Sequence, residues 1–216
     1  MGLALAEVLE RSRSAGFLGP GPVDEHIDHA HRFWAALQEA QSREGAELVD
    51  RTPAGGRLMD LGSGGGVPGL PLAVSVAELS LVLVDASQKR CSFLVWAAAE
   101  LGVADRVEVW CGRAEDLAHQ ERARAQFDYV TARGFGPPAS TVECGAPMLV
   151  HGGALAISEP PGGRVWPKVE LATVGLVKID MGNPHRSMAI FRKNGSVGDH
   201  YPRSSKDQQR SPLFVL

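Results

Sequence analysis

Short, continuous apolar runs alternate with segments of helical periodicity along most of this chain. Runs that lack a polar alternation are typical of strands buried on both faces, and they predict strands near 57–61, 80–85, 106–111, 127–132 and 152–158. The spacing between them predicts helices near 67–77, 87–101, 115–125 and 138–150. Such alternation indicates βαβ units with right-handed crossovers, and therefore an α/β fold with a mostly parallel sheet.

The chain begins with helical periodicity that precedes the first strand. Residues 2–13 show helical spacing, and Gly19-Pro20-Gly21-Pro22 interrupts it. Residues 23–49 then predict one long helix or two shorter ones. We expect these segments to form a small N-terminal helical extension over residues 1–54.

Two apolar runs near the C-terminus depart from the βαβ pattern. They cover 172–179 and 188–191 and are joined by Gly182-Asn183-Pro184, which predicts a hairpin and an antiparallel last strand. The expected core therefore covers residues 55–193. Residues 194–216 are expected to form a basic C-terminal tail that packs on or near this core.

The first predicted strand ends in an acidic residue and opens directly into a cluster of glycines. Glycine has no Cβ, so the backbone there can adopt positive φ and let a ligand lie against the peptide. Gly64-x-Gly66-x-x-Gly69 fits a dinucleotide fingerprint, whereas Asp60-x-Gly62-x-Gly64-x-Gly66 resembles the first motif of S-adenosylmethionine (SAM) methyltransferases. A pyrophosphate would be repelled by the Asp60 carboxylate, while SAM carries cationic sulfonium and amino groups. The charge therefore favours SAM over a dinucleotide.

Further candidate residues follow the other predicted strands. Asp85 lies about 20 residues beyond the glycines, the spacing at which an acidic residue reaches ribose hydroxyls, although a helix cap is the alternative. Ala114 and Glu115 would lie near an adenine, although an acidic residue in a first helical turn also complements the helix dipole. Ligands of open α/β sheets bind beyond the carboxyl ends of the strands. One site is therefore expected to contain Asp60, Gly62, Asp85, Ala114, Glu115, Thr131 and Arg133.

Composition limits the classes of protein to consider. The chain has 216 residues, of which 44% are hydrophobic and 22% charged, as expected for one soluble α/β domain with a short extension. No apolar run reaches the length of a membrane span, and the N-terminus lacks the pattern of a secretion signal. The three cysteines, an odd number, are widely spaced, which predicts a reducing, cytoplasmic location and buried thiols at Cys91, Cys111 and Cys144.

Charge and histidine spacing bear on partners. The net charge of -3 does not itself suggest a nucleic-acid-binding protein. Residues 192–210 nevertheless form a basic stretch, with the cations Arg192, Lys193, Arg203, Lys206 and Arg210. A local basic patch can bind phosphates, although a solvated terminus is the alternative. Spacings of three and two do not place three histidines on one helix face, so we expect no metal site and surface or RNA-proximal positions for His26, His29 and His31.

Several of these segments resemble one family. Residues 60–72 are similar to the loop of the bacterial RsmG (GidB) methyltransferases, which methylate N7 of a guanine in 16S ribosomal RNA, and the Pro68-Gly69-x-Pro71 sequel is the most specific part. Further similar segments are 84–94, 112–115, 130–135 and Tyr201-Pro202-Arg203 with Pro212-Leu213. The resemblance spans about 55–216. It implies a Rossmann-like class I SAM-dependent methyltransferase with a seven-stranded sheet.

The resemblance also implies roles for individual residues. Arg133 would act as the catalytic residue by holding the purine edge or a phosphate, with an ion pair to Asp60 or Glu115 as the alternative. Lys89, Arg90, Arg203 and Lys206 would face RNA. The predicted cofactor-binding residues are Asp60, Gly62, Ser63, Gly64, Gly66, Val67, Asp85, Ala86, Ser87, Ala114, Glu115 and Arg133.

The predicted reaction needs positioning more than proton transfer. Guanine N7 carries a free lone pair at neutral pH, so an enzyme that methylates it must hold this atom in line with the methyl group and needs no general base. The expected product is S-adenosylhomocysteine, the expected partner is ribosomal RNA or the small ribosomal subunit, and the expected state is a monomer.

The C-terminal segment departs from the family pattern, because residues 204–209 occupy the place where the family has glycine and proline. This departure leaves two alternatives open: a SAM-dependent methyltransferase of another RNA or of a small molecule, and a SAM-binding module without turnover. A dehydrogenase is a third alternative, because the glycine cluster also fits a dinucleotide fingerprint.

Overall fold

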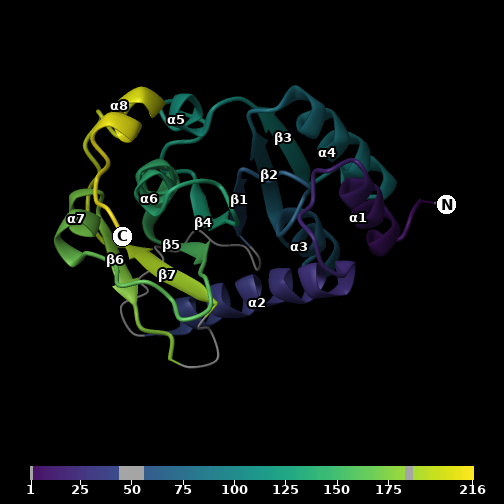
Figure 1. Cartoon of the computed structure of the whole chain (residues 1–216), viewed down its shortest axis with the longest axis horizontal. Coiled ribbons are helices and arrows are strands. Elements are labelled where there is room, and N and C mark those ends of the chain that lie inside the picture. The colour runs from purple at the N-terminus through teal and green to yellow at the C-terminus, as the bar shows by residue number, and fades with distance from the viewer. Residues whose placement is uncertain (1, 44–55, 183–186) are drawn as a thin grey trace.

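The protein is described from a computed structural model that covers residues 2–43, 56–182 and 187–216. The strands form a seven-stranded sheet in the order β3-β2-β1-β4-β5-β7-β6 (Figure 1). Their bounds are β1 Arg57–Leu61, β2 Ser80–Asp85, β3 Val107–Cys111, β4 Phe127–Ala132, β5 Leu149–Ser158, β6 Leu176–Ile179 and β7 Met188–Lys193.

Strand direction in the sheet confirms the predicted α/β class. The pairs β1–β2, β1–β4, β2–β3 and β4–β5 are parallel, and β7 is antiparallel to both of its neighbours, β5 and β6. The last strand of the chain is therefore antiparallel, as expected, but it lies between β5 and β6 and not at the edge. The Gly182-Asn183-Pro184 turn falls largely outside the described residues, since Asn183 and Pro184 are not among them.

Helices cover both faces of the sheet. One hydrophobic cluster joins one face of the sheet to α1 (Leu5–Ser14), α2 (Val23–Ser42), α3 (Gly69–Ser75) and α4 (Gln88–Glu100). A second cluster joins the other face to α5 (Ala114–Leu117), α6 (Pro138–Gly145), the 3-10 turn η1 (Ala146–Met148) and α7 (Lys168–Thr173). Successive strand residues divide between the clusters, as Leu58 and Met59 do, because side chains of a strand alternate between faces. The last helix, α8 (Ser205–Arg210), lies near α5 at the upper left of Figure 1.

Four predicted boundaries were wrong. The helix expected near 115–125 is the single turn α5, which ends at Leu117 and is followed by turns and not by further helix. The helix expected near 138–150 stops at Gly145, because Pro147 cannot continue an α-helix, and β5 starts earlier than expected, at Leu149. The apolar run at 172–179 begins inside α7 and turns at Gly175.

The N-terminal extension packs closely on the core. Helix α2 ends at Ser42, and the rest of the predicted 23–49 segment from residue 44 lies outside the described residues. Leu37 and Ala40 of α2 are fully buried in the first cluster. Within the described ranges, no helix combines the length and apolar character that crossing a membrane requires.

Candidate functional site

The glycine loop after β1 packs closely against the N-terminal extension. Gly62 and Gly64 have φ values of 65° and 53°, a region that residues with a Cβ rarely adopt. A Cβ at Gly65 would lie 2.8 Å from the carbonyl oxygen of Phe17, and the Ser12 hydroxyl donates a 2.9 Å hydrogen bond to the Gly65 carbonyl. The end of α1 therefore lies directly on the loop, and this contact needs a glycine.

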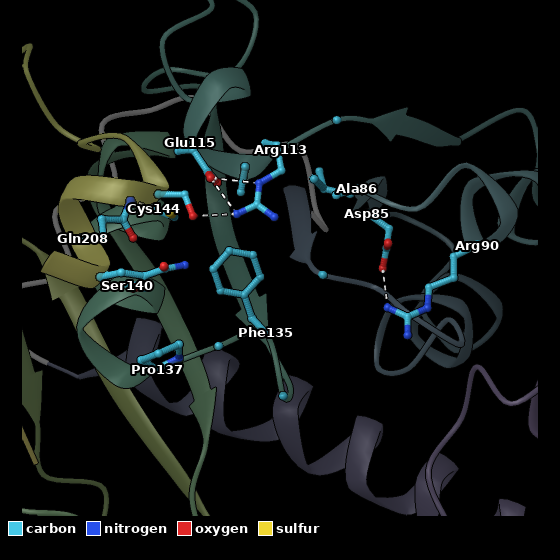
Figure 2. Close-up of a pocket in the computed structure, with 18 residues that line it drawn as sticks. Asp85, Ala86, Arg90, Arg113, Glu115, Phe135, Pro137, Ser140, Cys144 and Gln208 are labelled. Carbon is cyan, nitrogen blue, oxygen red and sulfur yellow. Dashed lines mark hydrogen bonds and ion pairs between the residues drawn. The ribbon is translucent and has the colours of Figure 1, made fainter. Parts of the chain in front are cut away.

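A pocket of about 310 Å³ opens beyond the carboxyl ends of β1, β2, β3 and β4. Figure 2 shows Asp85 and Arg90 on one wall, Ser140, Cys144 and Gln208 on the opposite wall, and Phe135 between them. Six of the residues singled out from the sequence line it, and these are Gly62, Asp85, Ala86, Arg90, Ala114 and Glu115. The pocket thus lies where ligands of open α/β sheets are expected.

The remaining predicted cofactor residues lie outside the lining of this pocket. Ser63 joins β1 to β2, because its hydroxyl donates to the Asp60 carbonyl at 2.9 Å and accepts from the Val84 N–H at 3.1 Å. The other predicted cofactor residues outside the lining are Asp60, Gly64, Gly66, Val67, Ser87 and Arg133. These residues shape the loop and the strand ends next to the pocket, and their contact with a cofactor stays a prediction.

Asp85 lines the pocket and also organises its wall. Its Oδ2 accepts a 3.0 Å hydrogen bond from the Gly64 N–H, and its Oδ1 accepts a 2.8 Å bond from the Ser87 N–H at the start of α4. Arg90 Nη1 lies 3.6 Å from Oδ2. A carboxylate has about four acceptor sites, so these contacts leave capacity for a hydroxyl group of a ligand. The ribose and helix-start interpretations are therefore compatible.

Glu115 forms an ordered pair with Arg113. Arg113 donates to Glu115 Oε1 from Nε at 2.9 Å and from Nη2 at 2.8 Å, and its Nη2 also lies 3.0 Å from the Ser205 hydroxyl of α8. The carboxylate beside it raises the pKa of Arg113. Both contacts use Oε1, so Glu115 Oε2 has no partner among the described residues and can accept a hydrogen bond from a ligand in the pocket.

Asp60 is buried beneath the loop, with an exposed fraction of 1%. Its Oδ1 accepts from the Thr131 hydroxyl at 2.8 Å, and its Oδ2 accepts from the Gly69 N–H at 3.2 Å. Burial raises the pKa of Asp60 to about 6, against the hydrogen bonds and the charge of Arg133, which lower it. The carboxylate therefore joins β1 to β4 and to α3 and does not face the pocket directly.

Arg133, at the end of β4, has neither of the ion pairs considered from the sequence. Its Nη2 lies 2.7 Å from His26 Nδ1, and its Nη1 is buried without a partner among the described residues. Burial lowers the pKa of Arg133, while the Asp60 charge raises it. An unsatisfied buried N–H is unfavourable by about 1–3 kcal/mol, so this nitrogen keeps a hydrogen bond to donate.

His26, His29 and one cysteine differ from expectation, whereas His31 is exposed as predicted. His26 is buried, and not at the surface, because it contacts Arg133. His29 packs edge-on against Phe33, and burial lowers its pKa to about 4. Cys111 is exposed, whereas Cys91 and Cys144 are buried as predicted. In the described parts of the chain, no three His, Cys, Asp or Glu side chains are grouped as metal ligands would be.

The cations of the basic stretch 192–210 lie in different settings, some buried and some exposed. Arg192 and Lys193 are buried in β7, where Lys193 Nζ donates to the Ala146 carbonyl at 3.0 Å and burial lowers its pKa to about 8. Arg203 binds the buried Glu143 carboxylate through Nε at 2.9 Å and Nη2 at 2.7 Å. This ion pair favours a structural role for Arg203 over the predicted contact with RNA. Lys89 and Lys206 are exposed.

Several lining residues were missed by sequence reasoning. Arg113 and Phe135 stand beside residues that were predicted, so the motifs themselves were a usable signal. Gly136 and Pro137, just before α6, were missed as well, and further missed residues come from α6 and α8, namely Ser140, Cys144, Ser205, Gln208 and Gln209. Nothing local marks these as pocket residues. The residues of α8 reach the pocket because Arg203 and Glu143, 60 positions apart, hold the C-terminal segment on α6.

The chain is similar in sequence to known proteins. The family model described as rRNA small subunit methyltransferase G (GidB) matches residues 27–158. A ribosomal RNA small subunit methyltransferase G from Sorangium cellulosum is 43% identical over 162 residues, which cover 72% of this chain and 66% of the relative. One from Synechococcus elongatus is 40% identical over 102 residues, covering 47% of this chain and 42% of the relative. The matches thus span less than two thirds of these relatives.

Solved structures share the fold. The cofactor-bound protein Rv0187 from MTB superposes with a TM-score of 0.60 at 16% identity, covering 89% of this chain and 90% of the other. A SAM-dependent methyltransferase from Thiobacillus denitrificans in complex with S-adenosyl-L-homocysteine has a TM-score of 0.51 at 20% identity, covering 83% and 74%. These likenesses confirm the predicted Rossmann-like fold of class I SAM methyltransferases.

Proposed function

The chain belongs to the rRNA small subunit methyltransferase G family, and we propose that it transfers a methyl group from SAM to N7 of a guanine in 16S rRNA. The observation that carries this proposal is the convergence of four parallel strands on one pocket, at the place where the strand order reverses between β1 and β4. Gly62, Asp85, Gly112 and Gly134 come from or directly follow these four strands.

The polar groups of the pocket fit an adenosine-containing cofactor. Asp85 has acceptor capacity left for a ribose hydroxyl, and Glu115 Oε2 can accept from the exocyclic amine of adenine. Phosphate groups would meet these two buried carboxylates, whereas SAM has no phosphate. When bound, SAM supplies an electrophilic methyl group on its sulfonium.

The contribution of the protein is binding and orientation. Gly62 lines the pocket with bare backbone, and a Cβ there would lie 2.8 Å from Phe135 Cδ2. Arg133 Nη1 offers a buried donor for an acceptor atom of the target nucleotide. Guanine N7 needs no deprotonation, so holding it in a near-attack geometry supplies the main catalytic effect.

The RNA would meet the protein at the rim of the pocket. Lys89 and Lys206 are exposed, and Arg90 lines the pocket with a side chain that is 43% exposed. The ion pair of Arg90 with Asp85 is long at 3.6 Å, so its charge is available to phosphates. We propose these three cations as RNA contacts.

The test is a methylation assay with assembled 30S particles, free 16S rRNA and labelled SAM. We expect 7-methylguanosine in the nuclease digest of one RNA substrate, and binding of S-adenosylhomocysteine by calorimetry. The variant Arg133→Ala should lose methyl transfer and keep its thermal unfolding transition, and wild-type turnover in this variant would contradict its assigned role. Binding without transfer to any RNA would identify a SAM-binding module, and affinity for NAD alone would identify a dehydrogenase.

A further inference from the structure

The N-terminal extension delivers a buried histidine to the end of β4. His26, in the second turn of α2, has an exposed fraction of 6%. Its Nδ1 lies 2.7 Å from Arg133 Nη2, and its Nε2 lies 3.2 Å from the Gly19 carbonyl oxygen. The two residues of the pair are 107 positions apart, so only the packing of α2 on the sheet brings them together.

The two partners of His26 determine its protonation state. A guanidinium has only donors, so Nδ1 must accept the hydrogen bond from Arg133. A carbonyl oxygen has only acceptor sites, so Nε2 must carry the proton and donate it to Gly19. The imidazole is therefore neutral, with its proton on Nε2, and both ring nitrogens are satisfied.

This contact limits the orientation of Arg133. A long arginine side chain has several rotatable bonds, and a hydrogen bond at Nη2 removes part of this freedom. The other nitrogen, Nη1, is buried and has no partner among the described residues. Gly134 and Phe135, which follow Arg133, line the pocket. The guanidinium is thus held at one nitrogen, while the other is buried and unpartnered among the described residues, beside residues that line the pocket.

We propose that His26 is a positioning residue for methyl transfer, which fixes the Arg133 guanidinium so that Nη1 meets an acceptor atom of the target nucleotide. This inference rests on the proposed function of the site and names how the N-terminal extension takes part in it. His26 itself does not line the pocket, so its effect on the target nucleotide would pass through Arg133.

The arrangement is sensitive to pH. Protonation would place a second N–H on Nδ1, facing the guanidinium, which removes the hydrogen bond and sets two cations together. Burial lowers the pKa of His26, and Arg133 lowers it further. Of the other charged groups facing His26, Arg13 lowers its pKa and Glu25 raises it, and His26 in turn lowers the pKa of His29. The proposed contact is intact at neutral pH and is lost as the pH falls.

Amide variants separate the two ring nitrogens of His26. In His26→Asn the side-chain oxygen takes the place of Nδ1 and can still accept from Arg133, whereas in His26→Gln the amide nitrogen takes the place of Nε2. We expect His26→Ala and His26→Gln to lower kcat on 30S particles by about 100-fold, the scale of a misplaced positioning group. In the wild type, loss of this contact at acidic pH should lower kcat. His26→Asn should retain activity within about fivefold of wild type at neutral pH and should not show this decrease at acidic pH.

Controls separate positioning from a general loss of structure. S-adenosylhomocysteine affinity should stay within about twofold in all three variants, and His31→Ala, on an exposed position of the same helix, should behave as wild type. Equal impairment of His26→Asn and His26→Ala, or wild-type kcat in His26→Ala, would overturn the proposal.

A spectroscopic measurement tests the proposal without turnover. Nitrogen-15 NMR at neutral pH should show His26 with its proton on Nε2, and Arg133→Ala should remove this preference. A proton on Nδ1 would overturn the proposal. Failure of wild-type protein to methylate any RNA would count against the proposed function alone, because the NMR result stands apart from it.

Discussion

The ends of β1 and β2 carry aspartates in similar settings, each after an apolar run and before a turn. Asp60 pairs in register with Leu83, so Asp85 lies two residues further along the neighbouring strand. Two residues of strand correspond to about 7 Å and bring the side chain back to the same face. Asp60 is therefore buried under the glycine loop, while Asp85 reaches the pocket.

The difference separates a carboxylate with structural contacts from one that we propose binds the cofactor. Asp60 accepts hydrogen bonds from Thr131 and Gly69, which belong to β4 and α3. Asp85 accepts from Gly64 of the glycine loop and from Ser87 at the start of α4. The depth of an acidic strand end in the sheet thus decides whether its side chain reaches the pocket.

The largest effect expected from this comparison is the pH dependence of stability at Asp60. Its pKa is raised from 3.8 to about 6, so the folded state binds a proton more tightly than the unfolded state. The corresponding stability is fully present below pH 3.8 and is lost as the pH rises towards 6. We measure the free energy of unfolding in urea for the wild type and for Asp60→Asn. The difference, wild type minus variant, should fall by on the order of 3 kcal/mol as the pH rises across this window. A difference that is constant with pH would contradict this prediction.

Cofactor affinity should depend on Asp85 and depend little on Asp60. We expect Asp85→Ala to weaken S-adenosylhomocysteine binding by about 30-fold, because a hydrogen bond to a charged group contributes about 1.5–3 kcal/mol. Asp60→Asn, which lies outside the pocket lining, should change affinity by less than about threefold. Calorimetry measures both, and equal losses would show that depth in the sheet does not separate their roles.

The support of Asp60 by β4 gives a smaller effect. Thr131→Val removes the hydroxyl that donates to Asp60 Oδ1 while nearly preserving side-chain shape. We expect a loss of about 1–2 kcal/mol in the free energy of unfolding at pH 7, measured in urea. Thr131→Ser keeps the hydroxyl and should lose less, so equal destabilisation by both variants would point to packing and not to the hydrogen bond.

The smallest effect concerns the rim beyond Asp85. Lys89→Ala and Lys206→Ala each remove an exposed cation proposed to contact RNA. Each should reduce the slope of log affinity for 30S particles against log salt by about 1, with cofactor affinity unchanged. Arg210→Ala removes an exposed cation that is not proposed as a contact, and the same change in slope there would mean that only overall charge matters.

Local pattern was sufficient for most of the fold. The apolar runs that predict β1, β2, β3 and β4 match the observed strands within one residue. β1, β2 and β4 are buried on both faces, and such strands need continuous apolar sequence, whereas β3 lies at the edge of the sheet and exposes Glu108. One boundary failed where a single residue changed the backbone, as Pro147 did after the end of α6. The glycine loop and Asp85 were also found, because close backbone approach and an acidic strand end leave local signals.

The sequence by itself therefore determined the α/β class, the family and one acidic wall of the pocket. The tertiary structure alone decided that His26 meets Arg133, that Arg203 binds Glu143, and that α8 closes the pocket. The physical reason is sequence separation. Periodicity reports which face of an element is buried, whereas contacts between residues 60 to 107 positions apart depend on how whole elements pack.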